Sequence, residues 1–367
     1  MQLFAQVVSI GIALVGIALF VKAIRQIIGT IKIGQPARRT DNPVGRSLTL
    51  LKESLGHTRM LQWHWVGAGH WFIMTGFGLL FFTLVTAFGQ LFDPGFHIPF
   101  LGQFFLFEWA SELFTLVMVV AIVAFIYYRA TRPKERVRGP KGRFWGSTMW
   151  QGYFVEMVIL GVGLCIVVLR GLEYALATTE DPEYASAFHF PLSFPIGEAF
   201  SGLSEGTIAN LIYLVAMLKI VISFTWMIVI SLQPTMGVAW HRFLAFFNIY
   251  FKRNADGAPA LGALPPVRAG GVAVDFSDLD ALDEDASLGT ATIEDFSWKG
   301  LLDLTSCTEC GRCQDACPAW ATDKPLSPKL LITALRDHAY AKAPYVQAAE
   351  GDRAALLEGD SKLALEA

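Results

Sequence analysis

Four cysteines lie close together near the C-terminal end of the sequence, and a fifth lies alone in an apolar run. The four form the pattern C-x2-C-x2-C-x3-C-P, made of Cys307, Cys310, Cys313, Cys317 and Pro318. This spacing is typical of segments that ligate a [4Fe–4S] cluster, because thiolates on a tight turn can reach separate irons of one cube. Such clustering indicates metal ligation in a reducing compartment rather than a framework of disulfides.

Two alternatives to a single cluster with four cysteine ligands stay open. Zinc also accepts four cysteines, although zinc sites usually use two C-x2-C pairs that a longer loop separates. In two-cluster ferredoxins, the fourth cysteine of such a run ligates the other cluster. The chain has one run, so either Cys317 completes this cluster or the sequence, which ends at Ala367, is incomplete and part of something longer.

His70 and His241 are the candidate axial ligands of a b-type haem. Ionisable side chains inside a bilayer are rare and usually functional. His70 lies in the second apolar segment, and His241 follows the fifth, where that helix would reach the cytoplasmic side. Two neutral imidazoles from facing helices suit a haem. Small residues beside them (Gly67, Gly69 and Gly237) would leave room for the flat ring.

Other polar residues near these histidines have several possible roles. Arg59 and Arg242 could pair with haem propionates. His57 and His64 are alternative haem ligands, quinone-site residues or interface residues, and a membrane histidine can also simply bond a neighbouring helix. Glu156 is a candidate for a proton path to a quinone. A second set, Glu108, Glu112 and Lys219, predicts either such a path or a structural ion pair.

The elements that position these residues are five apolar segments. The chain is 53% hydrophobic and 17% charged, with a mean hydropathy of +0.45, whereas soluble domains carry about 25% charged residues. A bilayer span takes about 20 apolar residues. Five segments fit that length or nearly so: Leu3–Val21, Val66–Phe88, Phe107–Tyr128, Tyr153–Leu169 and Ile208–Leu232.

The loops between these segments predict one orientation. Residues 22–62 carry eight Lys/Arg against two acids, and residues 129–149 carry seven against one. Residues 89–106 carry no Lys or Arg, and residues 170–207 carry one Arg and six acids. By the positive-inside rule, the two basic loops are cytoplasmic. We therefore expect a multi-pass protein of the bacterial plasma membrane, with its N-terminus outside and its cysteine run in the cytoplasm.

The predicted fold class is an all-α membrane protein with three parts. Residues 1–251 are predicted to form a five-helix transmembrane haem b domain. Residues 252–296, rich in Gly, Ala, Pro and Asp, predict a flexible acidic linker. Residues 297–367 predict a small cytoplasmic ferredoxin-type segment with helices near 298–304 and 327–343. The net charge of −3 gives no reason to expect nucleic acid as a partner.

These motifs resemble a known group of respiratory proteins. The run from His70 to Phe77 and the stretch Pro234…His241 resemble the ligating helices of the gamma subunit of respiratory nitrate reductase. Fusion of such a domain to the cysteine run resembles the membrane-anchored heterodisulfide-reductase-like iron–sulfur oxidoreductases. The runs Gly56–Met60 and Gly237–Phe243 look similar to electron transfer flavoprotein–menaquinone oxidoreductases. The resemblance covers residues 1–343 or so.

The resemblance implies a function and a haem count. It implies electron transfer from a reduced electron transfer flavoprotein, or another soluble reductase, through the cluster and haem b to menaquinone. Nitrate reductase gamma subunits carry two haems, but Leu80 and Ser223 occupy the positions of the second ligand pair here, which leaves one haem with His70 and His241. Relatives also carry further cysteine-rich parts, so we expect an additional iron–sulfur subunit or domain. The alternatives are a quinol-oxidising anchor that feeds a cytoplasmic heterodisulfide or sulfur reductase, and a haem-free redox-sensing scaffold.

Overall fold

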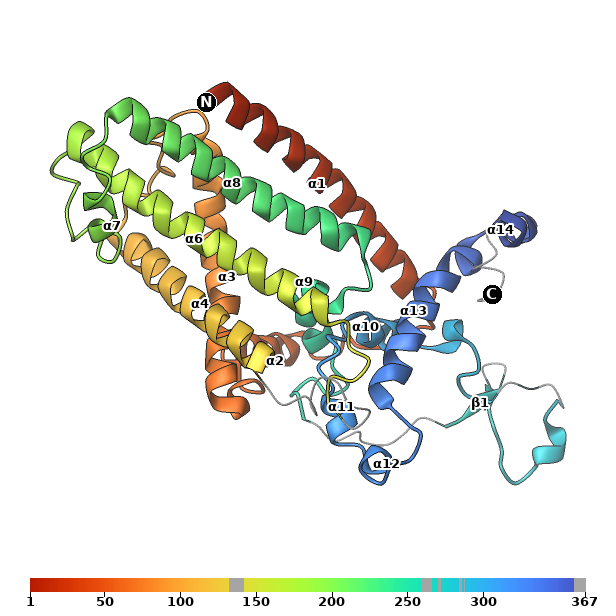
Figure 1. Ribbon diagram of the computed structural model, residues 1–367. Helices are drawn as coiled ribbons and strands as arrows, with labels where there is room; N and C mark the ends of the chain where they lie inside the picture. Colours follow the sequence, from red (N-terminus) through yellow and green to blue (C-terminus); the bar gives the residue numbers. More distant parts are fainter. Residues whose placement is uncertain (132–141, 259–265, 270–271, 284–285, 287, 360–367) are drawn as a thin grey trace. The chain divides into compact units, whose positions relative to one another are not determined.

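Figure 1 shows a computed structural model of the chain, which is 69% helical and has almost no sheet. It describes residues 1–131, 142–258, 266–269, 272–283, 286 and 288–359. These residues form two compact units. The first comprises residues 1–22, 57–133 and 148–233, and the second comprises residues 23–56, 134–147 and 234–367.

Five long helices have the length and composition of membrane spans, which confirms the prediction of five apolar segments. At 1.5 Å per residue, even the shortest of them is about 40 Å long, against about 30 Å for the hydrocarbon core. Only 17–39% of the residues in their apolar windows are buried within the protein, so much of the apolar surface is left for lipid. The helices are α1 (Gln2–Lys32), α3 (His64–Gln90), α4 (Phe105–Thr131), α6 (Met149–Glu180) and α8 (Glu205–Leu232).

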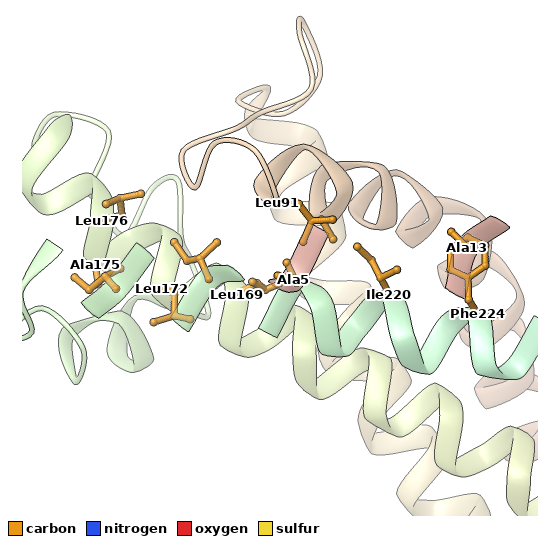
Figure 2. Close-up of a cluster of buried hydrophobic side chains, with 13 residues drawn as sticks. Ala5, Ala13, Leu91, Leu169, Leu172, Ala175, Leu176, Ile220 and Phe224 are labelled. Atoms are coloured by element: carbon orange, nitrogen blue, oxygen red, sulfur yellow. The ribbon is translucent and has the colours of Figure 1, made fainter. Parts of the chain in front are cut away.

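The core of the first unit is an apolar cluster between helices. Leu169 and Leu172 of α6 meet Ile220 of α8 and Leu91, which follows α3, with small residues of α1 beside them (Figure 2). The end of α3 is also held by polar contacts, because Gln2 and Gln6 of α1 donate to the carbonyls of Phe92 and Leu91, each at 2.9 Å. These carbonyls lie at a helix end and would otherwise lack a partner. The short helix α7 (Phe194–Glu198) packs on α6.

Helix α6 is longer than the sequence predicted, and this corrects the expected loop at residues 170–207. The helix continues to Glu180, eleven residues beyond Leu169. The extension carries charge into the bundle, where Arg170 pairs with Glu173 one turn later and with Glu112 of α4. A charged segment can stay helical here because its charges compensate one another.

The second unit is built from short helices around the cysteine run. Helix α9 (Gly237–Tyr250) packs against α2 (Pro43–Ser54) and α10 (Trp298–Thr305), and α10 packs against α13 (Pro328–Gln347). The buried guanidinium of Arg46 ties α2 to the end of α9 by donating to the carbonyls of Tyr250 and Lys252. The helices α10 and α13 lie where the sequence predicted helices. The remaining elements are η1 (Leu61–Trp63), β1 (Arg268–Ala269), β2 (Val272–Ala273), η2 (Leu279–Ala281), η3 (Ile293–Asp295), α11 (Arg312–Asp315), α12 (Pro318–Ala321), η4 (Glu350–Asp352) and α14 (Arg353–Gly359).

Serine caps fix the helix starts that flank the cysteine run. The hydroxyl of Ser297 accepts from the Gly300 N–H at the start of α10, and that of Ser327 accepts from the Leu330 N–H at the start of α13. Such caps satisfy backbone donors that have no partner within the helix. Within residues 252–296, β1 and β2 pair antiparallel, and Ile293 packs into the core of the second unit.

Candidate functional site: the cysteine loop and two histidines

The cysteine loop runs from the end of α10 to the start of α12. Cys307 follows α10, Cys313 lies in α11, and Cys317 precedes Pro318, the first residue of α12. The turn between them needs left-handed backbone at Gly311, with a φ of 72°. A Cβ at this glycine would lie 2.1 Å from the carbonyl oxygen of Arg143, so both the backbone conformation and the space require glycine.

Residues 142–147 form one wall of this loop. The Nε of Arg143 donates to the carbonyl of Cys310 at 2.6 Å, and the hydroxyl of Ser147 donates to the carbonyl of Glu309 at 3.0 Å. In return, the side-chain amide of Gln314 donates to the carbonyl of Gly142 at 3.0 Å. This wall, which joins two membrane spans in sequence, therefore fixes the backbone that carries the thiols.

Two buried cationic side chains, Lys329 and Arg336, lie near the thiols. Lys329 of α13 is 1% exposed, and its Nζ donates to the hydroxyl of Ser147 at 2.6 Å. Burial lowers the pKa of Lys329, whereas nearby Glu309 and the thiols raise it. Burial raises the pKa of the Cys307 thiol, and a hydrogen bond from the backbone N–H of Glu309 and the charge of Arg336 oppose that rise. Both opposing effects favour the thiolate, which is the form that binds metal.

The donor set fits an iron–sulfur cube. Four thiols share one loop, in which Cys310 and Cys313 are exposed while Cys307 and Cys317 are partly buried. Within the described part of the chain, no three His, Cys, Asp or Glu side chains converge on a point where a single ion would sit. A cube does not need such a point, because each of its irons takes one thiolate.

His241 lies on α9, next to the cysteine loop. Gly237 begins this helix, and a Cβ there would lie 1.8 Å from the carbonyl oxygen of Cys307, so the two backbones pack directly on each other. Burial, and to a smaller extent the charge of Arg242, lowers the pKa of His241 to about 4, so the imidazole is neutral at pH 7. It lines a cleft of about 250 Å³ together with residues of α9 and of the cysteine loop: Ala245, Asn248, Ile249, Lys252, Ser306 and Thr308.

His70 and His57 form a pair in the first unit. Nε2 of His57 lies 2.8 Å from Nδ1 of His70, and the two rings stack with centroids 5.0 Å apart. His57 is 4% exposed and adopts left-handed backbone, with a φ of 51°. The Met60 and Leu61 N–H groups donate to its carbonyl. The contact orients the His70 ring.

The glycines near the histidines have a different role from the predicted one. A Cβ at Gly67 would lie 2.1 Å from the Met60 carbonyl oxygen, and one at Gly69 would lie 3.0 Å from the ring of Phe125. With Gly237 against Cys307, all three glycines serve close packing within the protein. The prediction that they leave gaps for a macrocycle is therefore wrong.

The other predicted residues are placed as follows. Arg59 and His64 are exposed, and His64 begins α3 with a φ of 44°. Arg242 follows His241 on α9 and is partly buried, and burial lowers its pKa to about 10. Glu156 accepts hydrogen bonds of 2.7 to 3.1 Å from the guanidinium of Arg129. The carboxylate of Glu156 thus forms a bidentate ion pair with Arg129.

Sequence reasoning missed a polar network at the other end of the first unit. Its centre is Arg170, which donates to Glu112 at 3.0 Å and to Glu173 at 2.8 Å. Glu108 contacts His189 and Tyr184 rather than Lys219. Lys219 donates instead to the carbonyl and hydroxyl of Thr83, so the predicted structural pair is not formed. An arginine three residues before an acid, at the end of an apolar run, was the available signal.

The cysteine run lies within residues 298–319, which match a family model described as a 4Fe-4S binding domain. The EtfAB:quinone oxidoreductase of Syntrophomonas wolfei is 27% identical over 327 residues, which are 87% of this chain and 41% of that protein. The probable iron-sulfur-binding oxidoreductase FadF of Bacillus subtilis is 25% identical over 321 residues, again 87% and 41%. This chain is a homologue of iron–sulfur oxidoreductases.

A third relative matches a shorter stretch. A probable membrane-anchored ferredoxin of Chromohalobacter salexigens is 37% identical over 135 residues, which are 33% of this chain and 19% of that protein. The chain spans about two fifths of the length of the first two relatives. No solved structure matches it. The expected resemblance to iron–sulfur quinone oxidoreductases is thus confirmed by the relatives that match most of the chain.

Proposed function

We propose that this chain is the membrane-embedded part of a quinone-linked iron–sulfur oxidoreductase. It would pass electrons from a reduced electron transfer flavoprotein through a [4Fe–4S] cluster and a haem b to menaquinone. The observation that carries the proposal is a four-cysteine run, matched by a 4Fe-4S family model, on a chain with five helices that can span a bilayer. The name of one relative, EtfAB:quinone oxidoreductase, supports the quinone and the flavoprotein, and the name of the second, an iron-sulfur-binding oxidoreductase, supports the cluster.

The proposed ligands of the cluster are the four thiols of Cys307, Cys310, Cys313 and Cys317. When bound, such a cluster accepts and donates one electron at a time at a potential that its surroundings set. The chain holds the thiols on one tight turn and fixes the carbonyls of that turn with Arg143 and Ser147. It also provides cationic groups beside thiols that must ionise to bind iron.

His70 and His241 are the proposed axial ligands of the haem. Each imidazole has a feature that suits a ligand, because His57 orients the ring of His70 and burial keeps His241 neutral. When bound, a haem with two imidazole ligands carries one electron without binding substrate. The packing around Gly67 and Gly69 requires the ring to approach His70 from another side.

Further roles follow the same proposal. Arg59 and Arg242 are proposed partners of the propionates, and His64 is an alternative ligand or a quinone-site residue. His57 is better placed as the residue that orients His70, at 2.8 Å, than as a second ligand. Glu156 is a proposed proton-path residue, with Arg129 holding its carboxylate. A further cysteine-rich domain or subunit would complete the enzyme.

The proposed orientation has the N-terminus outside the cell and the cysteine run in the cytoplasm. The basic loops at residues 22–62 and 129–149 support it. The proposed division into a haem domain (1–251), a linker (252–296) and an iron–sulfur segment (297–367) follows the change of composition after Phe251. A cytoplasmic cluster could meet a soluble flavoprotein, whereas menaquinone stays in the lipid.

Cofactor content is the test of the proposed function. The full chain, purified anaerobically in detergent, should contain iron and acid-labile sulfide from the cluster and one haem b. Dithionite should give a sharp α-band, which menaquinone analogues should reoxidise. Zinc in place of iron would overturn the cluster, and well-metallated protein without an α-band would leave a haem-free scaffold. A haem potential well above that of menaquinone would favour the quinol-oxidising direction.

A further inference from the structure

Among the described residues of the second unit, three lysines are nearly fully buried, and one of them differs from the other two in the groups that its ammonium contacts. Lys299 is 7%, Lys342 is 8% and Lys329 is 1% exposed. Lys299 pairs with Asp303, and the Nζ of Lys342 lies 3.3 Å from a carboxylate oxygen of Glu294. The Nζ of Lys329 donates to neutral oxygens instead. These are the Ser147 hydroxyl and the carbonyls of Trp145 and Arg143.

A buried ammonium group without a negative partner is costly, because it loses its hydration and gains no opposite charge. The groups whose negative charge acts on Lys329 are Glu309 and the thiols of Cys313, Cys307 and Cys310. The carboxylate of Glu309 already accepts hydrogen bonds from Arg336, at 3.2 and 3.3 Å. This leaves the thiolates. In the described part of the chain, no other cation is directly bonded to them, so they are the negative groups that Lys329 can compensate.

We propose that Lys329 is the built-in counter-ion of the iron–sulfur cluster and raises its reduction potential. The proposal rests on the assignment of Cys307 to Cys317 as cluster ligands. A cube with four thiolate ligands has a net negative charge in both of its usual redox states, and it becomes more negative when it takes an electron. A fixed positive charge therefore stabilises the reduced state more than the oxidised one.

The wall at residues 142–147 holds this charge in place. Three oxygen atoms of this segment accept hydrogen bonds from the Nζ of Lys329. The side chains of Arg143 and Ser147, in the same segment, donate hydrogen bonds to carbonyls of the cysteine loop. The wall therefore fixes the ammonium group and the thiols to the same short piece of backbone. Because the charge is buried, dissolved salt should screen it much less than it screens a surface charge. Lys329 acts through position and charge and is not itself a redox group.

The test is a redox titration of the cluster, followed by electron paramagnetic resonance in the full-length protein. Lys329→Met removes the charge and keeps a long side chain, so the midpoint potential should shift to more negative values at unchanged iron content. Lys329→Arg keeps the charge and should stay near the wild type. Lys299→Met is the matched control, because it removes a buried lysine that already has a carboxylate partner. The shift should persist in about 1 M salt, where the Debye length is about 3 Å.

Several results would overturn the proposal. One is an unchanged midpoint in Lys329→Met, and another is an equal shift in Lys299→Met. If Lys329→Met fails to bind iron, Lys329→Gln takes its place. If both neutral variants lose iron and Lys329→Arg retains it, the positive charge at this position is still needed by the cluster. If all three variants lose iron, the proposed role of the charge is refuted. A wild-type chain without iron would instead refute the cluster ligands themselves. None of these measurements requires haem or quinone, so their outcome is separate from that of the electron route.

Discussion

At the scale of single residues, the cysteine loop combines reactive thiols with a backbone that other residues hold. Cys310 and Cys313 are exposed, and the carbonyl of Cys310 is bonded by Arg143. A thiol that is accessible and close to buried cations is available for iron. Cys165 is different, because it is buried in the middle of α6. The two kinds of cysteine should therefore respond differently to substitution.

Cys310→Ser should abolish the cluster, because a hydroxyl is a poor substitute for a thiolate ligand of iron. Iron and acid-labile sulfide per chain should fall to the level of protein without cluster, and the visible iron–sulfur absorption should disappear. Cys165→Ala is the control and should keep both. If Cys310→Ser contains as much iron as the wild type, Cys310 is not a ligand of the cluster.

Gly311→Ala should also lower iron content, although it removes no ligand. The residue has a φ of 72°, and the new Cβ would lie 2.1 Å from the carbonyl oxygen of Arg143. Left-handed backbone alone costs a non-glycine residue about 1–2 kcal/mol. Gly289→Ala is the matched control, since it has a φ of 75° but no atom within 4 Å. Iron loss should occur in the first variant and not in the second, and equal retention would contradict the role of the close contact.

His241→Ala should remove the α-band of the reduced haem and leave the protein inserted in the membrane. Burial lowers the pKa of His241, so the imidazole is neutral at pH 7, which is the form that ligates a metal. His338→Ala is the control, because this partly buried histidine lies on α13 and is not a proposed ligand. The measurement is the dithionite-reduced minus oxidised spectrum together with membrane-extraction yield. An unchanged spectrum in His241→Ala would refute this ligand.

At the scale of elements, α6 carries a buried charge network in the part of the helix beyond Leu169. Arg170 is 8% exposed and contacts Glu112 and Glu173, while its Nη2 donates to the carbonyl of His189. Removing one member of a buried ion pair leaves the other charge without compensation. Arg170 and the partners named here all belong to the first unit, whereas the cysteine run belongs to the second, so we expect the network to bear on stability rather than on iron binding.

Arg170→Met should destabilise the helical bundle by about 3–5 kcal/mol, the usual cost of leaving a buried charge without its partner. The free energy of unfolding in mixed detergent micelles is the measurement. Arg129→Met is the control, because Arg129 is 27% exposed and its ion pair with Glu156 is partly hydrated. A loss in Arg170→Met no larger than in Arg129→Met would refute the importance of the Arg170 network.

The helices themselves were predictable from sequence, whereas their ends and polar contacts were not. A bilayer needs about 20 apolar residues, and this requirement is visible in composition alone. The extension of α6 to Glu180 depends on compensation between Arg170, Glu112 and Glu173, which are separated by up to 61 residues. The cysteine spacing also revealed its chemistry, because ligands that share one turn are local in sequence. The wall at residues 142–147 is more than 150 residues from the cysteines and from Lys329, so its contacts with both became visible only in the structure.

At the scale of the whole molecule, the sequence pattern predicts that the cysteine run and the N-terminus lie on opposite sides of the membrane. Exposed thiols make this testable. In protein from which iron has been removed, a membrane-impermeant maleimide should label Cys310 and Cys313 in inside-out vesicles. It should not label them in intact spheroplasts until detergent is added. Labelling in spheroplasts would reverse the proposed orientation and contradict the positive-inside reading of the loops.

The wall at residues 142–147 also has a consequence for biogenesis. Its residues connect α4 to α6 and are translated more than 150 residues before the cysteines that they hold. The ribosome therefore completes the docking surface while the ligands are still unmade. The cluster cannot form before Cys307 to Cys317 have been made, and a nascent chain in which residues 142–147 are misplaced would present these thiols without the surface that bonds their loop. We therefore expect iron to be loaded only after α4 and α6, which flank this segment, have entered the membrane.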